Sequence, residues 1–128
     1  RADILNGKFI GLGLRPEKGF QSIAVEDIGV FAAIVFADAK THLGQTLELA
    51  GDELTEPQIA ETFTRVIGRL VWVAAPPENA RRDSEEEFNF FNGEGYDADI
   101  PALRKLHPGL LTLEQYLRKN GWENQPQD

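Results

Sequence analysis

The chain has 128 residues, a formal net charge of −8 and neither cysteine nor methionine. Its length suits a single domain, and the lack of cysteine excludes disulfides, thiolate metal sites and a cysteine nucleophile. The acidic balance disfavours nucleic-acid binding and no apolar run is long enough to span a membrane, so we expect a cytoplasmic protein that binds neither.

The first residue is also informative. Newly made chains begin with methionine, so a chain that starts at Arg1 and holds no methionine is expected to be a processed product or a fragment. The lack of a leader peptide at this N-terminus is therefore uninformative.

Residues 8–14 (KFIGLGL) have the apolar character of a strand, which Gly11 and Gly13 weaken. The glycines at positions 7, 11 and 13 suggest a phosphate loop. Their order does not match G-x-G-x-x-G, and no capped helix follows directly. The pattern favours a glycine-rich turn or an irregular strand.

The next segment predicts a strand over 20–26 and then a helix capped by Asp27 that runs to about residue 39. The body of this helix is apolar almost all round, so it must be buried on most sides. We expect it to pack between a sheet and another surface. In a homodimer that surface is a second chain, and Phe31 and Val35 lie in the interface.

Residues 47–69 carry the clearest local signals in the chain. Alternation predicts a strand over 47–50, which Gly51 and Asp52 break. A helix follows, with Thr55 as N-cap and Gln58 completing a capping box. Its remaining signals are Pro57 in the first turn, Gly68 as the stop, and an apolar stripe formed by Ile59, Phe63, Val66 and Ile67.

After this helix, the apolar run 70–75 predicts a buried strand that ends at Pro76 and Pro77. Two strands joined through a helix favour parallel pairing with a right-handed crossover. The charged run 78–87 is typical of a solvated helix face.

The C-terminal third contains two further helices. Asp97 or Asp99 caps a short helix over 100–106, and Thr112 caps a last helix that Gly121 stops. We expect Trp122 to fold back as an anchor. The whole pattern predicts an α/β domain over 1–123, with a small, mostly parallel partial sheet of three or four strands flanked by helices, and a disordered tail over 124–128.

Few side chains suggest chemistry. His107 ends a helix and is interpreted as a cap or dipole partner, and His42 as a surface residue. Asp52 and Glu53 form a carboxylate pair, but acids are expected ahead of a capped helix, and Asp97 and Asp99 have the same explanation. No set of histidines and carboxylates has metal-ligand spacing, so no metal site and no catalytic residue are assigned.

Aromatic residues cluster beside a turn at 92–95, and they include Phe88, Phe91 and Tyr96. Core packing is the simpler explanation for such a cluster. Rings beside a glycine-containing turn also suit the wall of a substrate pocket. We keep both interpretations, with Phe88, Phe91 and Tyr96 as the candidate pocket residues.

Three segments carry a family resemblance: 23–36 (IAVEDIGVFAAIVF), 47–68 (LELAGDELTEPQIAETFTRVIG) and 90–121. Together they resemble the C-terminal part of NmrA-like proteins, an atypical branch of the short-chain dehydrogenase/reductase superfamily. The resemblance implies an NAD(P)-binding Rossmann half followed by a smaller part that closes over the substrate cleft. It also implies that the aromatic cluster lies beside that cleft.

The chain lacks the two family motifs that bind the cofactor and transfer the proton. It has no glycine-rich strand-turn-helix of the dinucleotide type, and it lacks Tyr-x-x-x-Lys, because Ile100 follows Tyr96 by four residues and Asn120 follows Tyr116. No cofactor-binding residue is therefore assigned. NAD(P) is expected only together with a Rossmann half that this sequence does not contain.

Two functions follow from these observations. The first is a substrate-binding, cleft-closing portion of an NmrA-like NAD(P)-binding protein that is not catalytic by itself. The second is a homo-oligomeric interaction or regulatory module without a cofactor. A homodimer is expected for a chain that is stable alone, and a Rossmann half or another protein is the alternative partner.

Overall fold

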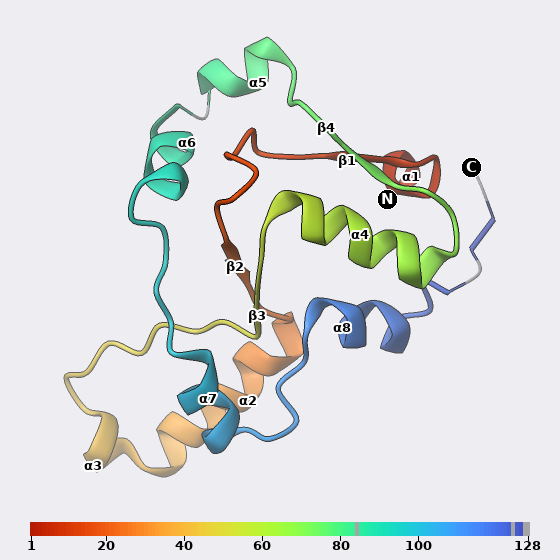
Figure 1. Ribbon diagram of the computed structural model, residues 1–128. Helices are drawn as coiled ribbons and strands as arrows, with labels where there is room; N and C mark the ends of the chain where they lie inside the picture. Colours follow the sequence, from red (N-terminus) through yellow and green to blue (C-terminus); the bar gives the residue numbers. More distant parts are fainter. Residues whose placement is uncertain (84, 124, 127–128) are drawn as a thin grey trace.

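The computed structural model describes residues 1–83, 85–123 and 125–126, without the side chains of 81–83. It is an α/β fold in which four short strands form two separate ladders (Figure 1). Strand β1 (Lys8–Ile10) pairs in parallel with β4 (Trp72–Ala74), and β2 (Phe20–Ser22) pairs antiparallel with β3 (Asp52–Leu54). The α/β class and the small parallel sheet flanked by helices are confirmed, whereas the single sheet of three or four strands is not what forms.

Helix α4 (Glu56–Ile67) lies against the β1–β4 ladder and has the predicted signals at both ends. The Thr55 hydroxyl accepts from Gln58 N at 3.3 Å, and the Gln58 amide oxygen accepts from Thr55 N at 2.9 Å. Gly68 ends the helix in the left-handed conformation, with φ of 81°. The capping box, the stop and the buried stripe are confirmed.

The strand ahead of α4 lies later than predicted, at Asp52–Leu54 and not at 47–50. Ala50 is buried in a core cluster, and Gly51 N donates to Ser22 O at 2.7 Å, which begins the ladder with β2. Gly51 was interpreted as a breaker. The structure shows that this glycine lets the backbone at Leu111 pass close by, because a Cβ at position 51 would lie 2.4 Å from Leu111 O.

Strand β4 is shorter and less buried than its apolar run predicted, and its partner is β1, not the strand ahead of α4. Leu70 is 74% exposed and Trp72 is 49% exposed, because the α4 layer covers one face of the two strands. The side chains on the other face of the strands are only partly covered in the described part of the chain.

Helix α2 (Val25–Ala37) begins two residues before its predicted cap, since β2 ends at Ser22 and Ala24 takes the N-cap position. The prediction that Asp27 caps the helix is therefore wrong. The helix is also less covered than its apolar composition predicted, because Val25 and Phe36 are 82% and 81% exposed. Phe31 is 1% exposed within its own chain, so it is not available to a dimer interface.

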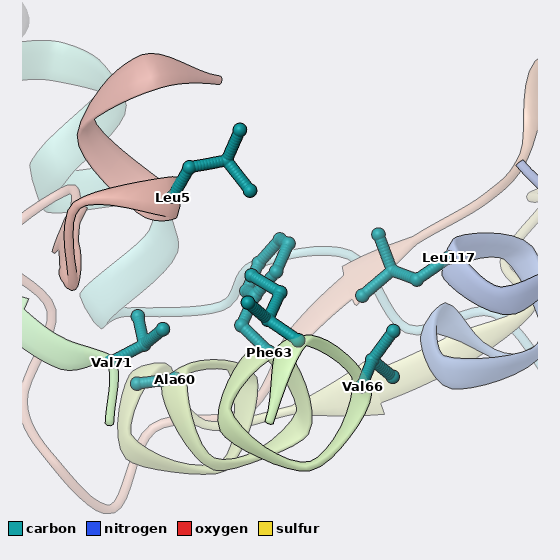
Figure 2. Packing of buried hydrophobic residues seen from close by; sticks show 7 residues of the cluster. Leu5, Ala60, Phe63, Val66, Val71 and Leu117 are labelled. Atoms are coloured by element: carbon teal, nitrogen blue, oxygen red, sulfur yellow. The ribbon is translucent and has the colours of Figure 1, made fainter. Parts of the chain in front are cut away.

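The first hydrophobic core joins α4 to the parallel ladder, to α1 (Ala2–Leu5) and to α8 (Leu113–Lys119). Figure 2 shows Phe63 at its centre, with Leu5 and Leu117 on opposite sides. The Phe63 ring stacks on the Phe9 ring, with 6.1 Å between ring centroids, and it contacts the Trp122 ring, with 5.4 Å between centroids. The expected fold-back of Trp122 is confirmed.

One ion pair, between Arg65 and Glu114, links α4 to α8, and Arg118 pairs with the same carboxylate from within α8. Arg65 and Arg118 both donate to Glu114 at 3.2 Å, and these hydrogen bonds hold the pKa of the Glu114 carboxyl below its ordinary value. Thr112 caps α8, as predicted, and Gln115 completes a capping box that was not predicted from the sequence.

The second core lies between α2 and α7 (Ile100–Leu106), where Phe31, Leu103 and Leu110 are almost fully buried. Asp99 is the N-cap of α7 and accepts from Ala102 N at 3.1 Å, which decides between the two predicted caps. Figure 1 shows this unit below the α4 layer, with the β2–β3 ladder leading into it.

The other helices are α3 (Ala39–His42), α5 (Glu78–Asp83) and α6 (Glu85–Asn92). Helix α6 includes the aromatic residues that were expected to follow a helix. No helix in the described part of the chain is long and apolar enough to cross a membrane. Residues 124, 127 and 128 of the predicted disordered tail lie outside the described residues, and Gln125 O accepts from Arg69 at 2.6 Å.

Candidate functional site at the ends of the parallel strands

An apolar hollow of about 230 Å³ lies where both parallel strands end. Residues that follow β1 form one wall and residues that follow β4 form another, while α5 and α6 close the third side. Ligands in open α/β sheets bind beyond the carboxyl ends of the strands. The lining residues are Ile10, Gly11, Leu12, Pro76, Pro77, Ala80, Glu87, Phe88 and Phe91.

Local sequence signals place these walls. Pro76 and Pro77 cannot continue the ladder, so the chain leaves the sheet directly after β4. It returns through α6, whose C-terminal end is bound to the loop after β1. Arg15 donates to Asn92 O and Lys18 donates to Gly93 O, both at 2.6 Å, so two cations satisfy carbonyls where α6 ends.

A buried carboxylate supports the wall after β1. Glu56, at the first position of α4, is 4% exposed, and its Oε1 accepts from Leu12 N at 2.6 Å. A Cβ at Gly11 would lie 2.6 Å from Glu56 Oε2, so a larger residue at this position would displace the carboxylate from its hydrogen bond. The carboxylate occupies the anion-favouring end of α4. This arrangement contradicts a phosphate loop at Gly7–Gly13, because a phosphate would meet a negative charge.

The structure places two of the three predicted pocket residues in the hollow. Phe88 and Phe91 line it, whereas Tyr96 lies outside, on a neighbouring polar depression that Phe91 also borders. The rings of Phe91 and Tyr96 are 5.8 Å apart, and Phe20 contacts Phe91 edge-on at 5.1 Å. The cluster therefore packs internally and forms a wall. Its role in ligand binding stays a prediction.

A buried pair that sequence reasoning missed joins α2 to α7. Asp27 is 3% exposed, and its Oδ1 lies 2.8 Å from His107 Nε2, while its Oδ2 accepts from Leu111 N at 3.0 Å. His107 is the C-cap of α7, as expected, but its partner is this carboxylate. Sequence offered one signal: an acid within an otherwise apolar helix, which is rarely buried without a partner.

Among the remaining candidates, the Asp52 carboxylate has a structural partner. Asp52 Oδ2 accepts from Leu113 N at 2.9 Å, and Glu53 is exposed on β3. Asp97 N donates to Glu48, and His42 is half-buried in α3, not in a surface loop. Within the described residues no group of histidines and carboxylates is arranged to hold a metal ion.

Comparisons with known proteins agree with this architecture. The family model described as the NmrA-like family matches residues 8–117. A search of curated proteins finds no match. Among solved structures, the chain is similar to the crystal structure of a double mutant of NmrA, with 18% identity and a TM-score of 0.68. The match covers 88% of this chain and 42% of that one, so the chain spans less than half of its structural relative.

Proposed function

This chain belongs to the NmrA-like family, and we propose that it is the substrate-facing, cleft-closing portion of an NAD(P)-linked protein and is not catalytic by itself. The observation that carries the proposal is the apolar hollow at the carboxyl ends of β1 and β4. Its position is the one in which open α/β sheets receive ligands. Its apolar walls suit the uncharged part of a substrate.

The incomplete sheet supports the same proposal. Parallel strands normally have both faces covered, and a two-stranded sheet is marginal alone. Here β1 and β4 have α4 on one face, while Leu70, Trp72 and Ile10 are 74%, 49% and 43% exposed. A Rossmann half would add strands that pair the open edges of β1 and β4, and its helices would cover these side chains from the open face.

The dinucleotide itself does not fit the described residues. Pyrophosphate binding needs a helix N-terminus with unoccupied N–H groups and little negative charge. The two longest helices described here begin with acids, Glu56 in α4 and Glu26 and Asp27 in α2. The cofactor is therefore assigned to a partner segment, and no catalytic step is assigned to this chain.

A calorimetric titration of the 128-residue chain with NADPH tests the proposal. We expect no saturable heat up to millimolar cofactor. The same chain joined to the dinucleotide-binding half of an NmrA-like protein should bind NADPH, and the combined emission of Trp72 and Trp122 should shift to the blue as the Trp72 ring is covered. Saturable binding by the chain alone would overturn the proposal, as would a joined protein whose Trp72 stays exposed.

The second candidate is a cofactor-free, homo-oligomeric interaction module. It is favoured by the exposed apolar side of α2, which includes Val25, Ile28 and Phe36. Such a surface marks an interaction site when its residues are contiguous. The two candidates differ in which surface associates, the parallel ladder or α2.

A further inference from the structure

We infer that the hollow after β1 and β4 receives a flat, uncharged ring group of one or two rings and discriminates against anions. This inference rests on the proposed function, because it names the kind of substrate that the hollow would face. It follows from the size of the hollow, the chemistry of its walls and the charges around it.

The size of the hollow limits its occupant. An apolar cavity of about 150 Å³ holds one benzene ring. At about 230 Å³, this hollow is larger than that cavity and smaller than the roughly 300–1,000 Å³ of pockets that enclose whole drug-sized ligands. A one- or two-ring group fits, whereas a dinucleotide does not.

The shape of the walls favours a flat group. Pro76 and Pro77 present saturated rings from the β4 side, and Phe88 and Phe91 present aromatic rings from α6. These rings offer dispersion contacts over a broad surface and few hydrogen-bonding atoms. A planar hydrocarbon surface therefore gains more here than a branched polar one.

The charges around the hollow disfavour anions. Among the described residues that line it, Glu87 is the only one that carries a charge, and the buried Glu56 carboxylate lies directly behind Gly11 and Leu12. Among the side chains that the structure describes, the cations Arg15 and Lys18 lie on this side of the fold and are hydrogen-bonded to the end of α6. An anionic ligand would lose hydration and meet two carboxylates.

Two probes of the same shape test the inference: 2-naphthol, which is uncharged at neutral pH, and the anion 2-naphthoate. We expect calorimetry to show saturable binding of naphthol that is at least about fivefold tighter than binding of naphthoate, the ratio that corresponds to about 1 kcal/mol of charge repulsion. Glu87→Gln should narrow this ratio. Equal or tighter binding of naphthoate, or no saturable binding of naphthol, would overturn the inference.

Matched variants locate the probe. Phe88→Ala should weaken naphthol binding by about tenfold through lost ring contact, whereas Phe90→Ala should leave it unchanged, because Phe90 is on the same helix but does not line the hollow. Ala80→Phe adds a ring within the hollow and should block the probe even if Phe88→Ala fails to fold. Equal effects at positions 88 and 90, or full binding by Ala80→Phe, would overturn the inference. The NADPH titration reports separately on the proposed function.

Discussion

At the scale of single residues, Asp27 shows how one buried carboxylate joins segments that are distant in sequence. Its two oxygens serve two partners, His107 Nε2 at the end of α7 and Leu111 N in the loop before α8. The ring of His107 also lies edge-on to Phe31, at 5.6 Å between centroids. The pair therefore links α2 to the second core through both polar and aromatic contacts.

Asp27→Ala should lower the free energy of unfolding by about 2–3 kcal/mol, because it leaves buried hydrogen-bonding groups without a partner. Asp27→Asn should cost about 1 kcal/mol, since an amide can accept from Leu111 N and donate to a neutral His107. Urea unfolding monitored by circular dichroism measures both. The control is Asp38→Ala, which removes an exposed acid at the other end of α2. Equal costs at positions 27 and 38 would show that the buried pair is not stabilising.

At the scale of elements, the predictions succeeded where the signals are local. The capping box of α4 and the Thr112 cap of α8 each lie within four residues, so sequence alone revealed them. The strands depend on distant partners: β1 pairs with a segment more than sixty positions away, and Ser22 and Asp52 meet across a ladder. The walls of the hollow at Gly11 and Pro76 follow from that pairing, which explains why only the aromatic side of the site could be predicted.

Thr55→Ala tests the cap of α4. Removing the hydroxyl leaves Gln58 N without its acceptor, and we expect a loss of about 1 kcal/mol in the free energy of unfolding. The measurement is the midpoint of urea unfolding, compared between proteins whose free energy of unfolding has the same dependence on urea concentration. Thr46→Ala, in the exposed loop ahead of β3, should change stability by less than about 0.5 kcal/mol. A loss no larger than that of the loop variant would show that the capping box contributes nothing to α4.

At the scale of the whole molecule, the fold consists of two small cores and an unfinished sheet. Phe63 is central to the first core and Phe31 to the second. Between them lie the β2–β3 ladder and the hydrogen bond from Leu113 N to Asp52. Neither core fully covers the outer face of β1 and β4, so the parallel ladder has both open strand edges and exposed apolar side chains for a partner to cover.

The open edges and exposed side chains of the parallel ladder predict that this surface associates when the chain is alone. Leu70 leads into β4 and is 74% exposed, and Phe36 ends α2 and is 81% exposed, so the two side chains are matched in size and exposure on different elements. We expect Leu70→Lys to reduce self-association more than Phe36→Lys does. A charge beside an open strand edge opposes edge-to-edge pairing, which offers backbone hydrogen bonds as well as apolar contact.

Light scattering over a concentration series measures the effect, and circular dichroism checks that both variants keep the fold. If Leu70→Lys shifts the chain toward the monomer and Phe36→Lys does not, the parallel ladder is the associating surface, as expected for a portion that completes a larger sheet. If only Phe36→Lys does so, α2 is the interface and the cofactor-free interaction module is the better proposal. A chain that is monomeric at every concentration would contradict both surfaces, because exposed apolar side chains on a two-stranded sheet favour association in water.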